Sequence, residues 1–308
     1  DHDGVLSDGE IEAILSMDLS GAYAQNIEGI EFFTDLQEVN MSQNPMVETI
    51  DLSHNTAIQR VNVSGSYNLQ NVTVAGCNEL HSLNMDGTAI SGLDLTGCDQ
   101  LEELYCAGTK IAALDVSGLE FLKVLECGYC SYLESLNLDG ASGLERINVN
   151  GSAVGTLTLK ELNSLTSVTA VNSKLQTLTI EQCSVLNTLD VNNSELTTAV
   201  LTEVPMLSMI TLSGNPFTQF TMEEFVVTVN SADMGAFELT GWYGTPNGSG
   251  FANIQAKPAA GYEFAGWTVT NANGTEEFLT PDYQYSFDST NGAATVTGNF
   301  RAPHVHQW

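Results

Sequence analysis

The apolar residues of this chain follow one short phrase: apolar, two other residues, apolar, one other residue, apolar. The phrase occurs 18 times, from Leu36-Val39-Met41 to Phe217-Phe220-Met222. The distance in residues from the start of one phrase to the start of the next, here called a step, has two values. The shorter step occurs only after odd-numbered phrases, so the repeating unit is a pair of phrases, present nine times. The final apolar residue lies at strand spacing, and the phrases are rich in Val, Ile and Thr, which favours strands over amphipathic helices. A fixed period of about 21 residues predicts a solenoid.

A second regularity lies at a fixed offset after the start of each phrase. The residues there are Asn44, Asn55, Ser66, Cys77, Thr88, Cys98, Thr109, Leu119, Cys130, Ala141, Ser152, Leu162, Ser173, Cys183, Ser194, Val204 and Asn215. Most are small or able to form hydrogen bonds, as is needed to satisfy a backbone that turns inside a coil. The combined pattern resembles the leucine-rich repeat, L-x-x-L-x-L-x-x-N/C-x-L, although Leu119, Leu162 and Val204 depart from it.

The six cysteines follow the same repeat. Cys77, Cys98, Cys130 and Cys183 occupy the Asn/Cys position, and Cys106 and Cys127 are final apolar residues of consecutive units. Free cysteine is a small, readily buried residue. Neighbouring rungs bring Cys77/Cys98 and Cys106/Cys127 near disulfide range, but parallel stacking rarely gives the required dihedral angle, so we expect free thiols.

Residues 1–34 predict a truncated EF-hand-like loop and a helical cap that covers the open end of the solenoid. Asp1-His2-Asp3-Gly4-Val5-Leu6-Ser7-Asp8-Gly9-Glu10 resembles an EF-hand or dockerin calcium loop from its third position onward. Asp1, Asp3 and Glu10 are then candidate side-chain ligands, with Val5 offering its carbonyl. The first ligand of the motif would precede residue 1, so Ca²⁺ is expected only with upstream residues present, and the alternative is an acidic capping loop. A helix is expected over residues 10–16. We expect no other cofactor.

Residues 35–222 form the predicted solenoid, and a change in composition near residue 223 marks a small C-terminal all-β or β-rich domain over 223–302, followed by a tail over 303–308. Five runs there alternate apolar and polar residues at strand spacing, namely 225–229, 254–256, 264–269, 283–287 and 294–300. Residues 256–267 and 296–300 resemble the Listeria–Bacteroides bacterial repeat, with Gly298 in place of the usual Ala. The aromatic residues are expected to form its core, the alternative being a sugar-stacking platform.

The arrangement as a whole resembles secreted, Bacteroidetes-type leucine-rich repeat proteins. This resemblance implies an extracytoplasmic location, secreted or on the outer cell surface, and recognition of a ligand. The composition agrees, since a formal charge of −30 disfavours nucleic acid and anionic membranes as partners. No apolar stretch is long enough to span a bilayer. The chain carries no P-loop, G-x-S-x-G, H-E-x-x-H or dinucleotide-binding motif, so we expect no enzyme.

The predicted ligand-binding surface is the concave sheet of the solenoid. The shorter steps follow only the first phrase of a pair, and this first phrase corresponds to the concave strand of the family. Side-chain alternation sends the residues beside its central apolar position to solvent. The candidate contact residues are Asn62, Asn84, Glu103, Tyr105, Glu126, Arg146 and Asn148. The expected partner is a protein. A structural spacer or a glycan-binding surface component is the alternative, and the Asn residues can equally be polar filler that hydrogen-bond one another.

Overall fold

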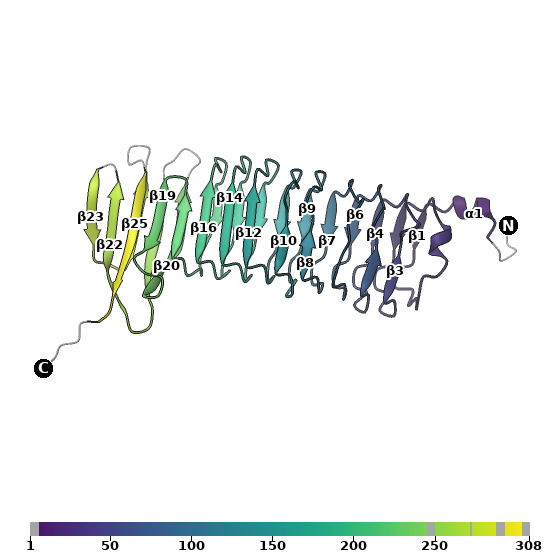
Figure 1. The fold of residues 1–308 in the computed structure, drawn as a ribbon, viewed down its shortest axis with the longest axis horizontal. Helices are drawn as coiled ribbons and strands as arrows, with labels where there is room; N and C mark the ends of the chain where they lie inside the picture. Colours follow the sequence, from purple (N-terminus) through teal and green to yellow (C-terminus); the bar gives the residue numbers. More distant parts are fainter. Residues whose placement is uncertain (1–5, 245–249, 272, 288–292, 304–308) are drawn as a thin grey trace. The chain divides into compact units, whose positions relative to one another are not determined.

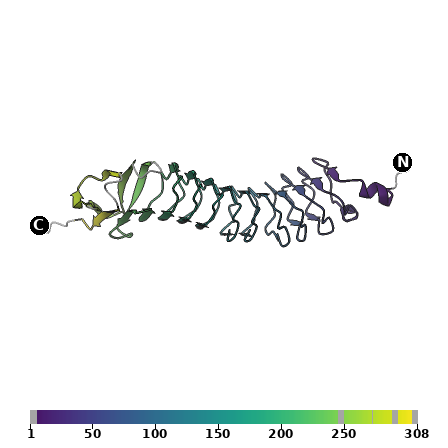
Figure 2. The same ribbon diagram turned by 90° about the horizontal axis from the view of Figure 1, so that it is seen from above.

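The chain is a mostly β solenoid, as the repeat predicts. The computed structural model describes residues 6–244, 250–271, 273–287 and 293–303. It contains two compact units, Asp1–Ala153 and Val154–Trp308. Figures 1 and 2 show successive coils lying side by side in each unit. Each coil contributes one strand to a front sheet, and most coils contribute a second strand to a back sheet.

The front strands of the first unit are parallel and in register. They are β1 (Ser16–Asp18), β2 (Glu38–Asn40), β4 (Arg60–Asn62), β6 (Ser82–Asn84), β7 (Glu103–Tyr105), β9 (Val124–Glu126) and β11 (Arg146–Asn148). The back strands of this unit form two separate pairs, β3 (Thr49–Asp51) with β5 (Asn71–Thr73) and β8 (Ala113–Asp115) with β10 (Ser135–Asn137).

The N-terminal segment differs from the predicted helical cap. Its α-helix, α1, covers only Asp8–Glu12, and a 3-10 helix, η1, covers Ile30–Phe32. Between them lies β1, which pairs with β2 as one more front strand. The expected helix over residues 10–16 is therefore wrong in extent, because Ser16 has to adopt an extended conformation to pair with Glu38. Among the described residues, the solenoid thus has seven front strands in the first unit and three in the second, and β1 is the one that precedes the nine predicted repeats.

The second unit continues the same alternation. Its front strands are β13 (Ser167–Thr169), β15 (Thr188–Asp190) and β17 (Met209–Thr211), and its parallel back strands are β12 (Thr156–Lys160), β14 (Thr177–Glu181), β16 (Thr198–Thr202) and β18 (Gln219–Met222).

The C-terminal strands extend this back sheet. The sheet adds β19 (Phe225–Val229), β25 (Ala294–Arg301), β22 (Glu263–Asn271) and β23 (Gly274–Phe278), while β20 (Gly235–Gly244), β21 (Gly250–Pro258) and β24 (Asp282–Phe287) form a second sheet. All five predicted runs lie in strands. The chain reverses direction after β18, so that Met222 pairs with Phe225.

Aromatic side chains form the core of this C-terminal region. Trp267 is fully buried, and the ring of Phe264 lies 5.1 Å from that of Trp267 and 5.7 Å from that of Phe300. These rings therefore serve packing. Gly298 also has a structural explanation, because a Cβ atom there would lie 2.7 Å from Trp267 Cζ3. Glycine at this position therefore makes room for the indole.

Buried polar side chains occupy the inside corner of the coils, at the position that the sequence identified. Asn215, only 1% exposed, donates from Nδ2 to the carbonyls of Val191 and Leu212, both at 2.8 Å, and accepts from the backbone N–H groups of Ser194 and Leu196. Asn44 similarly donates to the carbonyls of Leu19 and Met41. Such bonds satisfy backbone groups that turn away from the strand ladders. We call the residues at this fixed offset after the start of each phrase, from Asn44 to Asn215, the inner ladder.

Cysteine performs the same task where it replaces Asn. The Sγ atoms of Cys77, Cys98 and Cys130 donate to the carbonyls of Leu52, Val74 and Cys106 at 3.5, 3.3 and 3.0 Å. All six cysteines are free and buried, which confirms the prediction of free thiols. Cys106 and Cys127 lie on adjacent coils with their Sγ atoms 3.1 Å apart.

Replacement of Asn215 by Ala is expected to destabilise the protein by about 3 kcal/mol, because it removes four buried hydrogen bonds and leaves their backbone partners without substitutes. Asn163→Ala is the matched control, since Asn163 is exposed and its two side-chain hydrogen bonds, to the Glu161 carbonyl and from Ser184 Oγ, are exposed as well. It should cost less than about 0.5 kcal/mol. Urea denaturation monitored by circular dichroism measures both. Equal effects of the two substitutions would contradict the role of the inner ladder.

The buried thiols predict a loss of stability at alkaline pH. Burial raises the pKa of Cys77 to about 11 and that of Cys98 to about 12. The unfolded chain loses these protons near pH 8.5, so this contribution to stability is complete below that pH and is lost as the pH rises toward 11–12. The urea concentration at the unfolding midpoint should therefore decrease as the pH is raised from 8 to 10.5, and it should decrease less steeply in Cys77→Ala/Cys98→Ala.

A thiol reagent at pH 8 should modify the six cysteines only in urea. Rapid modification of the native protein would refute their burial.

Candidate functional site

The front strands of the first unit present two rows of side chains on one face, which we call the front face. Residues in the first and third positions of each strand share this face, because side chains alternate along a strand, and the middle residues of the front strands from β2 to β11 are buried. The first-position row is Ser16, Glu38, Arg60, Ser82, Glu103, Val124 and Arg146, and the third-position row is Asp18, Asn40, Asn62, Asn84, Tyr105, Glu126 and Asn148.

All seven ligand-binding candidates lie on this face. Asn62, Asn84, Tyr105, Glu126 and Asn148 are consecutive members of the third-position row. Glu103 and Arg146 stand in the first-position row, on β7 and β11. The structure thus brings the candidates together along five neighbouring strands. Their contact with a ligand stays a prediction.

The Asn side chains of the third-position row are fixed by their own backbone. The Oδ1 atoms of Asn40, Asn62 and Asn84 accept hydrogen bonds from the N–H groups of Ser42, Ser64 and Asp86 at 3.1, 3.1 and 3.0 Å. Each bond closes an Asx turn, in which the side chain binds the backbone two residues on. The turn ends the strand and also sets the orientation of the amide group.

The other half of each of these amides is available. In the part of the chain that the structure describes, the Nδ2 groups of Asn40, Asn62 and Asn84 have no hydrogen-bond partner, and the three side chains do not bond one another. Asn148 is different, since its Nδ2 donates to Glu126 Oε2 at 2.7 Å. The row therefore presents three oriented donors on successive strands, about 4.8 Å apart.

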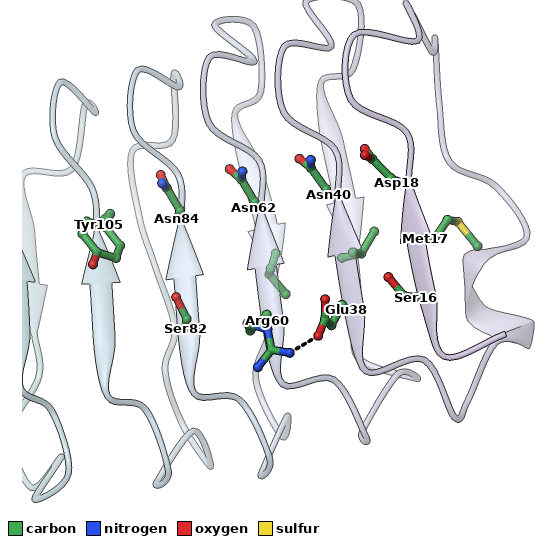
Figure 3. Close-up of a pocket in the computed structure, with 12 residues that line it drawn as sticks. Ser16, Met17, Asp18, Glu38, Asn40, Arg60, Asn62, Ser82, Asn84 and Tyr105 are labelled. Carbon is green, nitrogen blue, oxygen red and sulfur yellow. Dashed lines mark hydrogen bonds and ion pairs between the residues drawn. The ribbon is translucent and has the colours of Figure 1, made fainter.

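The front face is hollowed over β1, β2, β4, β6 and β7, with a volume of about 410 Å³ (Figure 3). Asn62, Asn84 and Tyr105 were predicted for this surface. The other residues that line it are Ser16, Met17, Asp18, Glu38, Val39, Asn40, Arg60, Val61 and Ser82. Figure 3 shows Asp18, Asn40, Asn62, Asn84 and Tyr105 in one line, with Ser16, Glu38, Arg60 and Ser82 in a second line beside it.

Three of the missed residues come from β1. Their signal was in the sequence, because Ile14, Met17 and Leu19 follow the same apolar spacing as the later phrases. The phrase was hidden within the segment interpreted as a helical cap. Because β1 was not predicted, its residues were not recognised as lining this end of the hollow, and Asp18 was not recognised as the first member of the third-position row.

The charges of the front face are partly paired. Arg60 forms an ion pair with Glu38 across β4 and β2, and Ser82 Oγ donates to Glu103 Oε2 at 3.2 Å. Burial raises the pKa of Tyr105, and the charge of Glu103 raises it further, so its phenol stays protonated near neutral pH. The face presents carboxylates at Asp18, Glu38, Glu103 and Glu126 against guanidinium groups at Arg60 and Arg146. It is therefore mixed in sign with an acidic excess.

The predicted calcium ligands Asp1, Asp3 and Val5 lie outside the described residues. Glu10 lies on α1, where its carboxylate accepts hydrogen bonds from Ser7 N at 2.9 Å and from Ser7 Oγ at 2.8 Å. These bonds close a capping box and lower the pKa of Glu10. Among the described residues, no group of three His, Cys, Asp or Glu side chains is placed to hold a metal ion. Calcium binding stays a prediction.

Solved structures with a similar fold include bacterial internalin-type proteins. The functional domain of InlJ from Listeria monocytogenes, described as including a cysteine ladder, aligns with 96% of this chain and 82% of its own at 13% identity and a TM-score of 0.45. InlP of Listeria monocytogenes aligns with 97% of this chain and 90% of its own at 14% identity and a TM-score of 0.42. An internalin of the same species, InlF, aligns with 69% of this chain and 77% of its own at 16% identity and a TM-score of 0.36.

No protein-family model and no curated protein matches the sequence. Among the described residues, no helix has the length and apolar character needed to cross a membrane. The repeat, the inner ladder and the strand order together show that the chain is a mostly β leucine-rich repeat solenoid, and its structural neighbours include internalin-type leucine-rich repeat proteins of bacteria.

Proposed function

We propose that this chain is a non-catalytic recognition protein that binds a protein ligand through the front face of its first unit. The observation that carries the proposal is the row of Asn40, Asn62 and Asn84, whose amide oxygens are bound by the backbone and whose Nδ2 groups face a hollow. Leucine-rich repeat solenoids provide extended surfaces of this kind for partners. As part of the proposal, we place the protein outside the cytoplasm, secreted or on the outer cell surface.

The amide row favours binding because its members are already ordered. A free surface Asn loses rotamer freedom when it binds a ligand, and this loss lowers the affinity. Here the Asx turns restrict the side chains before any ligand arrives. The three Nδ2 groups are donors, so the complementary surface of the partner has to present acceptors, such as backbone carbonyl groups, at matching intervals.

Tyr105 supplies an aromatic anchor at one end of the hollow. It lies on β7, between Asn84 on β6 and Glu126 on β9, its partners in the two adjacent strands. Aromatic residues are enriched among the few positions that dominate binding energy at protein interfaces. At the other side of the hollow, the Glu38–Arg60 pair offers charged groups whose orientation is already set by their mutual contact. These features combine an apolar anchor with polar groups of fixed direction.

Removal of the amide donors is expected to weaken binding without unfolding the coils. In Asn40→Ser/Asn62→Ser/Asn84→Ser, the hydroxyl oxygens still accept from the local backbone in ST turns, although more weakly. The three amide NH₂ donors are lost, and only the shorter hydroxyl groups replace them. A screen of wild type against a panel of extracellular proteins identifies ligands, and surface plasmon resonance then measures each variant. The triple variant should bind at least about tenfold more weakly.

The matched control is Asn137→Ser, because Asn137 makes the same kind of turn on the back strand β10, where Oδ1 accepts from Asp139 N at 3.2 Å. It should bind as wild type. Ligands that bind the triple variant and the wild type equally would contradict the proposed surface. A screen in which wild type binds no protein would instead favour a structural spacer.

Tyr105→Ala is expected to reduce affinity for the same ligand by about 30-fold, corresponding to about 2 kcal/mol for the loss of an aromatic anchor. Tyr23→Ala provides the control, since Tyr23 is 74% exposed in the same unit but does not line the hollow. Isothermal titration calorimetry measures both variants. A reduction of equal size in Tyr23→Ala, or no reduction in Tyr105→Ala, would show that the ligand does not use this face.

A further inference from the structure

A second hollow lies away from the front face, at the turns that lead from front strands to back strands. It has a volume of about 320 Å³ and is lined by Tyr67, Asn68, Gln70, Ala89, Ser91 and Lys110. These residues come from three successive coils of the first unit. We call this hollow the edge notch. It shares no lining residue with the hollow of the front face.

The edge notch results from a change in turn length. After the inner-ladder residue Ser66, two residues, Tyr67 and Asn68, precede the next buried leucine. After Thr88 and Thr109, a single residue precedes the next buried isoleucine, Ala89 and Lys110 respectively. Two residues are again present after Cys130, at positions 131 and 132. The two shorter turns thus lie between longer ones and leave a recess.

The back sheet is also interrupted at this place. Strand β5 ends at Thr73 and the next back strand, β8, begins at Ala113. The intervening coil passes through residues 90–95, which are described but form no strand. The same coil contributes Ala89 and Ser91 to the edge notch. The recess therefore coincides with the coil whose back segment lacks sheet pairing.

Lys110 brings a positive charge into the recess. Five other basic side chains, Arg60, Lys123, Lys160, Lys257 and Arg301, form ion pairs. Lys110 forms none with any residue that the structure describes, although the chain has a net charge of −30. Its backbone N–H donates to the Ile90 carbonyl at 2.9 Å, which fixes the turn that carries it. The ammonium group is therefore available to an anion.

The other lining residues suit a hydroxylated ring. Tyr67 is 63% exposed and offers an aromatic surface. Gln70 and Ser91 are exposed and carry amide and hydroxyl groups, while Asn68 Nδ2 donates to the Pro45 carbonyl at 2.7 Å and so holds its side chain in place. An aromatic face, polar hydrogen-bonding groups and one cation together match a sugar ring that bears a carboxylate. The volume is at the low end for small-ligand sites, which suits one such ring.

We propose that the edge notch binds a carboxylate-bearing sugar, such as a uronic or sialic acid residue, with its carboxylate on Lys110 and its ring against Tyr67. This site is independent of the front face, so a solenoid of this kind would recognise a protein on one surface and an acidic glycan on its edge. The open recess gives weak binding, with a Kd of about 1 mM for a single sugar.

The test titrates the whole chain with glucuronate, N-acetylneuraminate, glucose and acetate, followed by ligand-detected NMR at about 0.15 M salt, where long-range repulsion by the acidic surface is screened within about 8 Å. At least one of the two acidic sugars should bind with a Kd of about 1 mM, and glucose and acetate should bind at least about tenfold more weakly. Lys110→Gln should weaken the acidic sugar about tenfold. Tyr67→Ala should do the same while leaving the melting temperature unchanged.

Two control variants separate this site from general effects. Lys174→Gln removes another exposed lysine that forms no ion pair among the described residues, and Tyr23→Ala removes another exposed tyrosine. Both should bind the acidic sugar within twofold of wild type. Failure of wild type to distinguish the acidic sugars from glucose would overturn the proposal, as would equal losses in Lys174→Gln and Lys110→Gln. Acetate binding as tightly as the sugars, with no effect of Tyr67→Ala, would overturn the sugar assignment.

Discussion

Hydrogen bonds from polar side chains to the turning backbone hold each coil of this solenoid in shape. A coil that reverses direction after each short strand leaves carbonyl and N–H groups that no neighbouring strand can satisfy. Inside the coil, the inner ladder satisfies them, with four bonds at Asn215 and single bonds from thiols such as Cys98. On the front face, the Asx turns of Asn40, Asn62 and Asn84 satisfy the N–H groups just beyond the strands. Apolar burial drives the stacking of coils, and these bonds define the shape that is stacked.

The same bonds connect the fold to recognition. An amide has two ends, and the Asx turn uses only the oxygen. The nitrogen end is then presented to solvent in a direction that the backbone sets. A residue that the fold needs for its turn thereby becomes an oriented donor, repeated at the spacing of the strands. The interpretation of the Asn row as structural filler and its interpretation as a binding surface are therefore compatible, since one hydrogen bond serves the fold and the free group is available to a ligand.

Much of the fold was predictable because its causes are local and repeated. Apolar spacing in the sequence identifies the later front strands, and the position of Cys98 and its equivalents identifies the inner ladder. The extra strand β1 was missed because its phrase, although one repeat length before Leu36, lies in a segment with a helical start at Ser7 that was interpreted as a helical cap. The front-face hollow was missed in part for the same reason. The packing of Trp267 on Gly298 depends on strands distant in sequence, and no local pattern indicates it.

The account rests on the orientation of the front-face amides before a ligand binds. Relaxation measurements on the side-chain ¹⁵NH₂ groups of Asn62 and Asn84 test this orientation directly. The reference is Asn26, which is exposed and whose side chain makes no hydrogen bond with any residue that the structure describes. If the Asx turns fix the amides of Asn62 and Asn84, their order parameters should approach the value of rigid backbone, about 0.85, while that of Asn26 should be lower. Values below about 0.6 at Asn62 and Asn84 would mean that the donors are mobile, and would contradict the view that the backbone prepares this face for recognition.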